Sequence, residues 1–294
     1  MRYRVAHTTT YSYDDDVSSS YGLAHLRPRE LPWQHVSSRG VSIDPVPGDL
    51  SHDVDGYGNV VSYFHVTEPH TRLIIDALSD VTVEVPAYDA GALAEPWERS
   101  RPIVEPTVSP RAWAAAEFAL ESPKARHIAE AHTYGAASLL PGRPIGEAVT
   151  DLMHRIKTNF HYDKTATTVT STVADVMDKR AGVCQDFAHL ALACLRSHGV
   201  AARYVSGYLA TRRLAGKPRL VGADASHAWV AAWLPASDQW LAFDPTNDQW
   251  AGDRHVTVAW GRDYGDVPPV KGVIFTEAKK STLRVAVDVA PIEG

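Results

Sequence analysis

The chain is poor in cysteine and has no long apolar run. Only two of its 294 residues are cysteines, Cys184 and Cys194, so a secreted scaffold held by disulfides is not expected. The longest apolar stretches, 190–195 and 228–234, are far too short to cross a bilayer, which predicts no membrane partner. Residues 1–16 contain no apolar segment of the kind that forms a secretion signal. Together these features predict a cytoplasmic protein.

The chain also lacks an excess of positive charge. It has 29 Lys and Arg against 35 Asp and Glu, a formal net charge of -6, and a mildly acidic protein is a poor nucleic-acid partner. The densest basic stretch, 211–219, is expected to be a solvated loop. Hydrophobic residues make up 45% and charged residues 22%, which is ordinary for a globular protein. A length of 294 residues favours two domains, or one large domain with an appended layer.

Several common catalytic and metal-binding motifs are missing. A zinc site is the alternative chemistry, because Cys194 and His198 are spaced i, i+4 on one predicted helix face. Cys184 and His189 lie nearby in the sequence. However, the sequence has no Cys-x-x-Cys pair and no second clustered ligand pair. Ser226 precedes a histidine, yet the nucleophile-elbow pattern of serine hydrolases is absent. A phosphate-binding glycine loop is absent as well. We therefore expect neither a metal nor a cofactor.

What is present divides the chain into three parts. Residues 1–86 alternate β-branched and aromatic residues between turns rich in Pro and Gly, which predicts a β-rich domain. Residues 87–144 contain several prolines with helical pieces between them and form a connecting segment. Residues 145–294 are expected to form a core of helices and strands, completed by an alternating strand at 282–289.

Hydrophobic periodicity and capping residues predict individual elements. Helices are predicted at 109–120, 145–160, 172–179 and 184–198. Strands of the first domain are predicted at 3–13, 41–43, 60–66 and 73–85. Strands of the core are predicted at 202–209, 227–234 and 240–243.

Cys184 begins the predicted helix 184–198, directly after a glycine-containing turn. Unpaired backbone N–H groups and the helix dipole stabilise negative charge there, by about 0.3–1 kcal/mol at an exposed site and up to ~2 kcal/mol when partly buried. They favour the thiolate, the nucleophilic form of cysteine, and can hold the oxyanion of an attacked carbonyl. Cys184 also begins the apolar stripe of this helix, so an inert buried cysteine is the alternative. Cys194, within the stripe, is expected to be core.

A base for this thiolate is predicted on a hairpin. If Leu234 pairs with Gln239 across the Pro-Ala-Ser-Asp turn, Trp229 lies opposite Asp244. His227 then lies on the same face as Trp229, diagonal to Asp244. That carboxylate could accept the imidazole Nδ1–H, fix the tautomer and stabilise the imidazolium. A lone histidine on a strand is more often structural, and the hairpin geometry is what favours a catalytic role.

Ordered motifs around these residues resemble the bacterial transglutaminase-like cysteine protease family. The motifs are AGVCQDFA at 181–188, ARYVSGY at 202–208, DASHAWV at 224–230 and FDPTN at 243–247. Residues 10–11 with 55–59 resemble the β-domain that precedes the core in this family, and GRDY at 261–264 with DVPPV at 266–270 resembles its closing segment. The resemblance covers nearly the whole chain except 87–144.

The resemblance implies an α+β fold. A papain-like transglutaminase core packs a helix bearing the cysteine on an antiparallel sheet bearing histidine and aspartate, and an N-terminal β-domain precedes it. The matching positions make Cys184 the nucleophile, His227 the base and Asp244 the orienting acid. Asp186 and Trp229 are candidate supporting residues.

The implied activity is thiol-dependent acyl transfer on peptide, isopeptide or glutamine amide bonds of a peptide or protein substrate, with no cofactor. Hydrolysis is favoured, because bacterial members are often described as peptidases. A protein-crosslinking transglutaminase and a non-catalytic binding or assembly module that keeps the fold are the alternatives. Ala231 is a departure, since relatives often carry an acidic residue after His-Ala-Trp-Val.

Overall fold

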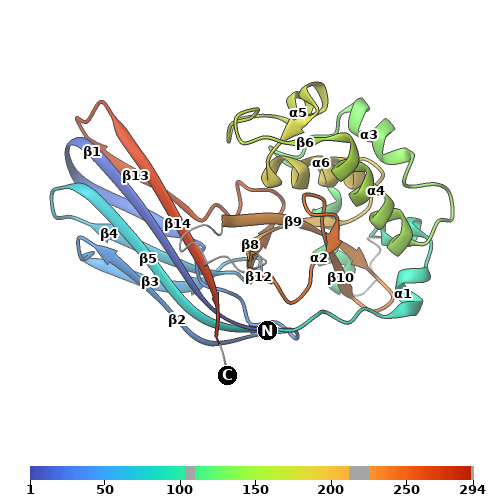
Figure 1. The fold of residues 1–294 in the computed structure, drawn as a ribbon, viewed down its shortest axis with the longest axis horizontal. Helices are drawn as coiled ribbons and strands as arrows, with labels where there is room; N and C mark the ends of the chain where they lie inside the picture. The colour runs from blue at the N-terminus through green and yellow to red at the C-terminus, as the bar shows by residue number, and fades with distance from the viewer. Residues whose placement is uncertain (103–109, 212–224, 293–294) are drawn as a thin grey trace, which may run out of the picture.

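The computed structural model describes residues 1–102, 110–211 and 225–292. Two large sheets, a short two-stranded pair and a layer of helices make up this part of the chain (Figure 1). The predicted basic loop 211–219 lies outside the described residues, apart from its first position. Within the described ranges, no helix is both long and apolar enough to span a membrane.

The first lobe is a twisted sheet built around one very long strand, β1. In the described residues the sheet has seven strands, with the order β2-β5-β1-β4-β3 and with β13 and β14 also paired to β1. All its pairings are antiparallel. The strands are β1 (Arg2–Ala24), β2 (Gln34–Asp44), β3 (Asp49–Val54), β4 (Val60–Val66), β5 (His70–Val83), β13 (Val270–Thr276) and β14 (Ser281–Pro291).

We expected the last strand to complete the core formed by residues 145–294, but it belongs to the sheet of the first lobe. β14 pairs with β1 from Tyr3 opposite Pro291 to Tyr13 opposite Ser281, so the end of the chain returns to the first lobe. Alternation in the sequence reveals a strand but not its partner, and here the partner is the start of the chain. The expected boundaries at 86 and 144 stay predictions.

The second lobe has an antiparallel sheet covered by helices (Figure 1). Its order is β11-β10-β9-β8-β12 within the part of the chain that the structure describes, and a short parallel pair, β6 with β7, lies outside it. The strands are β6 (His161–Tyr162), β7 (Ala181–Gly182), β8 (Ala202–Leu209), β9 (Ala225–Leu234), β10 (Gln239–Asp244), β11 (Gln249–Trp250) and β12 (His255–Gly261). The helices are α1 (Ala90–Ala94), α2 (Pro110–Ala116), α3 (Ala129–Ala136), α4 (Ile145–Asn159), α5 (Val173–Lys179) and α6 (Cys184–Arg196), with 3-10 turns at Trp97–Ser100 and Glu117–Ala119.

Helix α6 is the central element of the second lobe. Its residues from Asp186 to Arg196 are all buried, and its apolar side chains pack in one cluster with those of α4, β8 and β9. The helix ends where Gly199 adopts a positive φ of 80°, which a glycine adopts without steric cost. Tyr3, Val5, Val287 and Val289 of the first lobe belong to the same cluster, so one apolar core joins the lobes.

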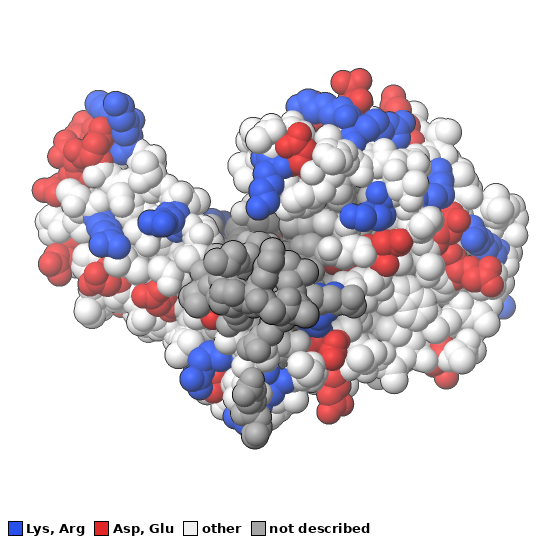
Figure 2. Space-filling view, in the orientation of Figure 1, with Lys and Arg blue, Asp and Glu red and all other residues white. Residues whose placement is uncertain are grey.

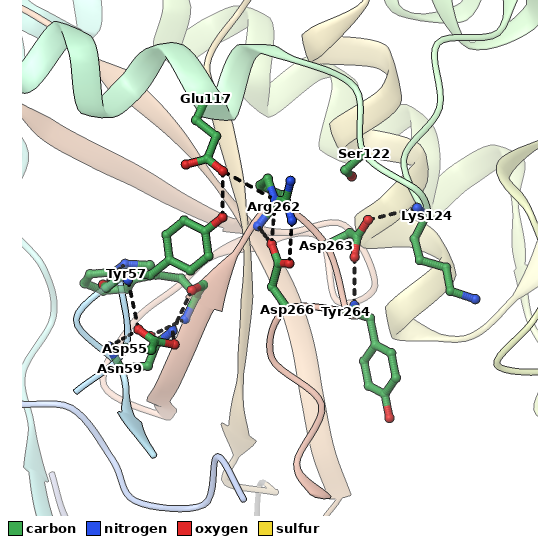
Figure 3. A network of polar contacts seen from close by, with 12 residues as sticks. Asp55, Tyr57, Asn59, Glu117, Ser122, Lys124, Arg262, Asp263, Tyr264 and Asp266 are labelled. Carbon is green, nitrogen blue, oxygen red and sulfur yellow. Dashed lines mark hydrogen bonds and ion pairs between the residues drawn. The ribbon is translucent and has the colours of Figure 1, made fainter. Parts of the chain in front are cut away.

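A polar network ties the two lobes together at the end of β12 (Figure 3). The side-chain amide of Asn59 donates to the Trp260 carbonyl, and its Oδ1 accepts from the Trp260 N–H, both at 2.9 Å. The Tyr57 hydroxyl donates to Glu117 at 2.8 Å, and Arg262 lies 3.5 Å from the same carboxylate. Arg262 also binds Asp266 through two nitrogens at 2.9 Å. The motifs at 55–59 and 261–264, about two hundred positions apart, therefore meet at one interface.

The close packing of β8, β9 and β12 can be tested at Gly207. A Cβ there would overlap the Val256 carbonyl oxygen and lie 2.6 Å from the Trp229 ring. We expect Gly207→Ala to lower the free energy of unfolding by roughly 1–3 kcal/mol in urea titrations, because the packed sheet must shift. The matched control is Gly40→Ala in β2, where a Cβ meets no atom within 4 Å and the change should stay within about 0.5 kcal/mol. Equal losses in the two variants would contradict this packing.

Candidate active site

Cys184 lies at the first position of α6, where the chain turns from a strand into a helix. The turn is held by β7, which pairs with β6, and by the extended backbone of Val183, the N-cap. The Cys184 side chain is partly exposed, whereas Cys194 is fully buried in the core. Burial raises the pKa of the Cys194 thiol to about 12, so that thiol stays protonated and unreactive. Of the two thiols, only Cys184 is placed to react.

The hairpin that carries the histidine and the carboxylate has the predicted register. Gln239 of β10 pairs with Leu234 of β9, and the pairing runs on to Phe243 opposite Val230. This register brings His227 to Asp244, and the two side chains are joined by a hydrogen bond of 2.7 Å.

The imidazole atom in that bond differs from our expectation. Nε2 of His227, not Nδ1, contacts Asp244 Oδ2. Strand pairing fixes the position of the Cβ but not the rotation of the ring, so the sequence could not decide between the two nitrogens. Cys184 is among the groups that raise the pKa of His227, which places its sulfur near the ring, and with Nε2 engaged, Nδ1 is the nitrogen available to the sulfur.

The electrostatics of this group favour a charged pair. Burial lowers the pKa of His227, but hydrogen bonds to Asp244 and Cys184 and the negative charges of both outweigh it and raise that pKa to about 10. For Asp244, burial raises the pKa, but the hydrogen bonds with His227 and His255 dominate and hold that pKa well below its usual range. The geometry thus stabilises an imidazolium between a carboxylate and a sulfur.

Asp244 is fully buried, and its other contacts hold it in place. Its Oδ1 accepts backbone N–H bonds from Thr246 at 2.9 Å and Asn247 at 3.2 Å. Its Oδ2 accepts from the Asn247 amide at 2.7 Å and from His255 Nε2 at 3.3 Å. The contact of Asp244 with His255, at the start of β12, was not predicted from the sequence. Its only signal is a histidine six positions before the GRDY motif, which does not reveal that two distant strands meet.

His227, Asp244 and His255 offer three ligand atoms within 4.8 Å of one another, which raises the question of a metal site. The hydrogen bonds around them fit a different arrangement. The Gly252 N–H donates to His255 Nδ1 at 3.1 Å, so the proton of a neutral His255 is on Nε2 and points to the carboxylate. The Asn247 amide also donates to Asp244 Oδ2, the oxygen that His255 contacts. These donors fit a hydrogen-bonded carboxylate better than a metal ligand.

The residues of the rival zinc hypothesis are held in other contacts. Cys194 is enclosed in the core. His198 Nε2 bonds to the His132 carbonyl at 2.9 Å, and its ring stacks on His132 at 4.0 Å. His189 Nε2 accepts the Tyr264 N–H at 3.2 Å. Among the described residues, they are not found in any group of ligand atoms that could hold a metal.

Asp186, a predicted supporting residue, holds the turn before Cys184. Its Oδ2 accepts the Val183 N–H at 2.8 Å and the Thr167 hydroxyl at 2.6 Å. A Cβ on Gly182 would lie 2.8 Å from the same oxygen, so the carboxylate fits against a position without a side chain. Asp186 therefore links the start of α6 to the loop at residue 167.

Trp229, the other predicted supporting residue, packs inside the sheet and does not line an open surface. It is 1% exposed. Its ring lies 6.0 Å from that of His227 and meets that of His255 edge-on at 5.2 Å. Of the two roles considered, cleft wall or packing, the contacts support packing beneath the two histidines.

A cavity of about 360 Å³ opens beside His227. Tyr162 also lines it. The pKa of this tyrosine is raised, mainly by burial and to a smaller extent by the charge of the nearby Cys184. Among the described residues, the lining consists of Lys157, Tyr162, Leu209, Thr211, His227, Thr246 and Asn247. A larger hollow of about 640 Å³ lies against α1 and α4, and its lining contains none of Cys184, His227 and Asp244. The smaller cavity is therefore the candidate substrate cleft.

The role of Asp186 can be tested against a capping carboxylate elsewhere. We expect Asp186→Ala to lower the free energy of unfolding by about 1–3 kcal/mol and also to slow alkylation of Cys184 by iodoacetamide, because the Val183 N–H loses its acceptor and the turn loosens. Asp175 accepts the Thr172 N–H at 2.8 Å at the start of α5. Asp175→Ala should therefore cost stability without slowing the alkylation. Unchanged alkylation in Asp186→Ala would refute the positioning role.

Comparisons with known proteins identify the family and the fold. Residues 3–82 match the family described as bacterial transglutaminase-like N-terminal region, and residues 126–245 match the transglutaminase-like superfamily. An uncharacterized protein of Mycobacterium bovis is 47% identical over 100% of this chain and 94% of its own length. One of Mycobacterium leprae is 31% identical over 98% of each chain. The crystal structure of a candidate cysteine protease from Cytophaga hutchinsonii has the same fold, with a TM-score of 0.70 at 18% identity over 98% of this chain and 90% of that one.

Proposed function

Because the chain belongs to the transglutaminase-like superfamily, with the bacterial N-terminal region, we propose that it is a thiol-dependent enzyme that transfers acyl groups from amide bonds. The observation that carries the proposal is the 2.7 Å hydrogen bond between His227 Nε2 and Asp244 Oδ2. The histidine in this bond is also influenced by Cys184, a partly exposed cysteine at the start of a helix. A buried ionised pair costs desolvation energy, so packing alone gives no reason to keep one at this position.

The first half-reaction forms a thioester. The Cys184 sulfur attacks the amide carbon, and the carbonyl electron pair moves to oxygen. The Cys184 backbone N–H, at the start of α6, is the proposed donor to this oxyanion, and one such donor contributes about 2.7–4 kcal/mol to the transition state. The C–N bond then breaks as the His227 imidazolium gives its proton to the leaving amine.

The second half-reaction releases the acyl group. Neutral His227 takes a proton from water, and the resulting hydroxide attacks the thioester carbon. The C–S bond breaks, which restores the thiolate and the imidazolium together. Asp244 keeps the ring oriented throughout and stabilises its charge. If a substrate amine replaces water, the same steps give transamidation.

Hydrolysis of a peptide or protein substrate is the outcome we propose. The name of the Cytophaga hutchinsonii protein, a candidate cysteine protease of the same fold, supports it. The cytoplasm is the proposed compartment, because the reaction needs a reduced thiol and both Cys184 and Cys194 are free.

Substitution of Cys184 tests the nucleophile and the reaction type together. A pool of unstructured proteins is incubated with the enzyme and a fluorescent primary amine, then analysed by mass spectrometry. We expect new peptide termini or deamidated glutamines with wild type, and a loss of more than about 1000-fold with Cys184→Ala, because no other nucleophile takes its place. Incorporation of the amine in place of hydrolysis would indicate a crosslinking transglutaminase.

The matched control for this test is Cys194→Ala. That substitution removes a buried sulfur and should cost stability, but the activity per folded molecule should stay at the wild-type level. Iodoacetamide should modify Cys184 and leave Cys194 intact in the folded protein. Persistent activity in Cys184→Ala would refute the proposed chemistry.

The raised pKa of His227 sets the expected alkaline limit of activity. Below a pKa of about 10 the imidazolium is present and can protonate the leaving amine, and as the pH rises through that value the proton is lost. We therefore expect kcat/KM to fall with rising pH near 10 and not near 6.5. A fall centred on the ordinary histidine value, measured with a substrate that does not titrate in this range, would contradict the pairing with Asp244.

A further inference from the structure

His255 lies beneath the proposed catalytic group, on a strand that the triad does not use. It is the first residue of β12 and 3% exposed. In the sheet order, β9 and β8 separate β10 from β12, so its contact with Asp244 is a tertiary one. The charged or titratable groups that act on it are Asp244, His227 and, next to it in the chain, Arg254.

The hydrogen bonds of His255 fix its protonation state. Its Nδ1 accepts the Gly252 N–H at 3.1 Å, so Nδ1 carries no proton. Burial lowers the pKa of His255, although Asp244 opposes the effect, and the ring is neutral. A neutral ring without a proton on Nδ1 carries it on Nε2, and Nε2 lies 3.3 Å from Asp244 Oδ2. His255 is thus a donor to the oxygen that His227 also contacts.

Resting on the proposed function, we propose that His255 is a positioning residue for the catalytic group. Its Nε2–H holds Asp244 Oδ2 in line with His227 Nε2 and keeps the carboxylate ionised. Three elements then converge on one oxygen: His227 from β9, Asn247 from the turn after β10, and His255 from β12. Because β12 continues into the interlobe network at Arg262, the site is anchored to the strand that also joins the two lobes.

The competing explanation is that His255 only fills space. Its ring meets Trp229 edge-on at 5.2 Å, and such a contact needs a ring but no proton donor. Two substitutions separate these roles. His255→Phe keeps an aromatic ring and removes the donor. His255→Gln removes the ring and keeps an N–H donor at a similar distance along the side chain.

Two readouts are needed, and the first requires no substrate. The rate of Cys184 alkylation by iodoacetamide is measured against pH for wild type and both variants, after their folding has been checked by thermal unfolding. In His255→Phe we expect the midpoint of this curve to move to higher pH by about 0.5–1 unit, because a loosened Asp244 stabilises the imidazolium, and through it the thiolate, less well. In His255→Gln the midpoint should match wild type.

The second readout is kcat/KM on the substrate found with the protein pool. His255→Phe should lower it roughly tenfold, the lower end expected for loss of a hydrogen bond to a charged group, while His255→Gln should stay within about threefold of wild type. The opposite pattern, in which His255→Phe keeps its kcat/KM and His255→Gln loses it, would show that the ring only packs. Equal losses in the two variants, or no loss in either, would also overturn the proposal.

The design separates this proposal from the proposed function. If wild-type Cys184 reacts with iodoacetamide no faster than a simple thiol at neutral pH, the nucleophile assignment fails, whatever His255 does. If wild type reacts fast and His255→Phe follows the same curve, only the role of His255 fails. Should His255→Phe not fold, His255→Gln alone decides the matter, because a tenfold loss in a folded Gln variant would rule out the donor role.

Discussion

The hydrogen bond between His227 and Asp244 is the interaction on which the rest of the site depends. Both side chains are buried, and each is held in its charged form by the other. A charge pair away from water is stable only if further hydrogen bonds satisfy it. The structure supplies these from the backbone of Thr246 and Asn247, from the Asn247 amide and from His255.

The fold can be understood as the support for this pair. The β9–β10 hairpin sets the spacing of histidine and carboxylate, and α6 presents Cys184 to the imidazole from the other side. Trp229 packs against both histidines, and the missing side chain at Gly207 leaves room for its ring. The cavity beside His227 lies next to this pair and is the candidate cleft for a substrate.

The N-terminal lobe is more than an appendage to the core. β1 and β14 contribute apolar side chains to the cluster that surrounds α6, and the loop at 55–59 binds the end of β12. The lobe interface and the contact with the carboxylate therefore lie on the same strand, β12. The family resemblance on both lobes fits this dependence, because the lobes share one core.

The sequence by itself determined the nucleophile candidate, the hairpin and its register, because helix starts, turns and alternation are local patterns. The predicted register brought His227 to Asp244 for the same reason. The place of Cys184 opposite them was implied by the family resemblance and not by a local pattern. Tertiary structure alone decided which imidazole nitrogen contacts the carboxylate, which strand pairs with β14, and that His255 reaches Asp244. Ring rotation and contacts between distant strands depend on packing in three dimensions, and no local pattern encodes them.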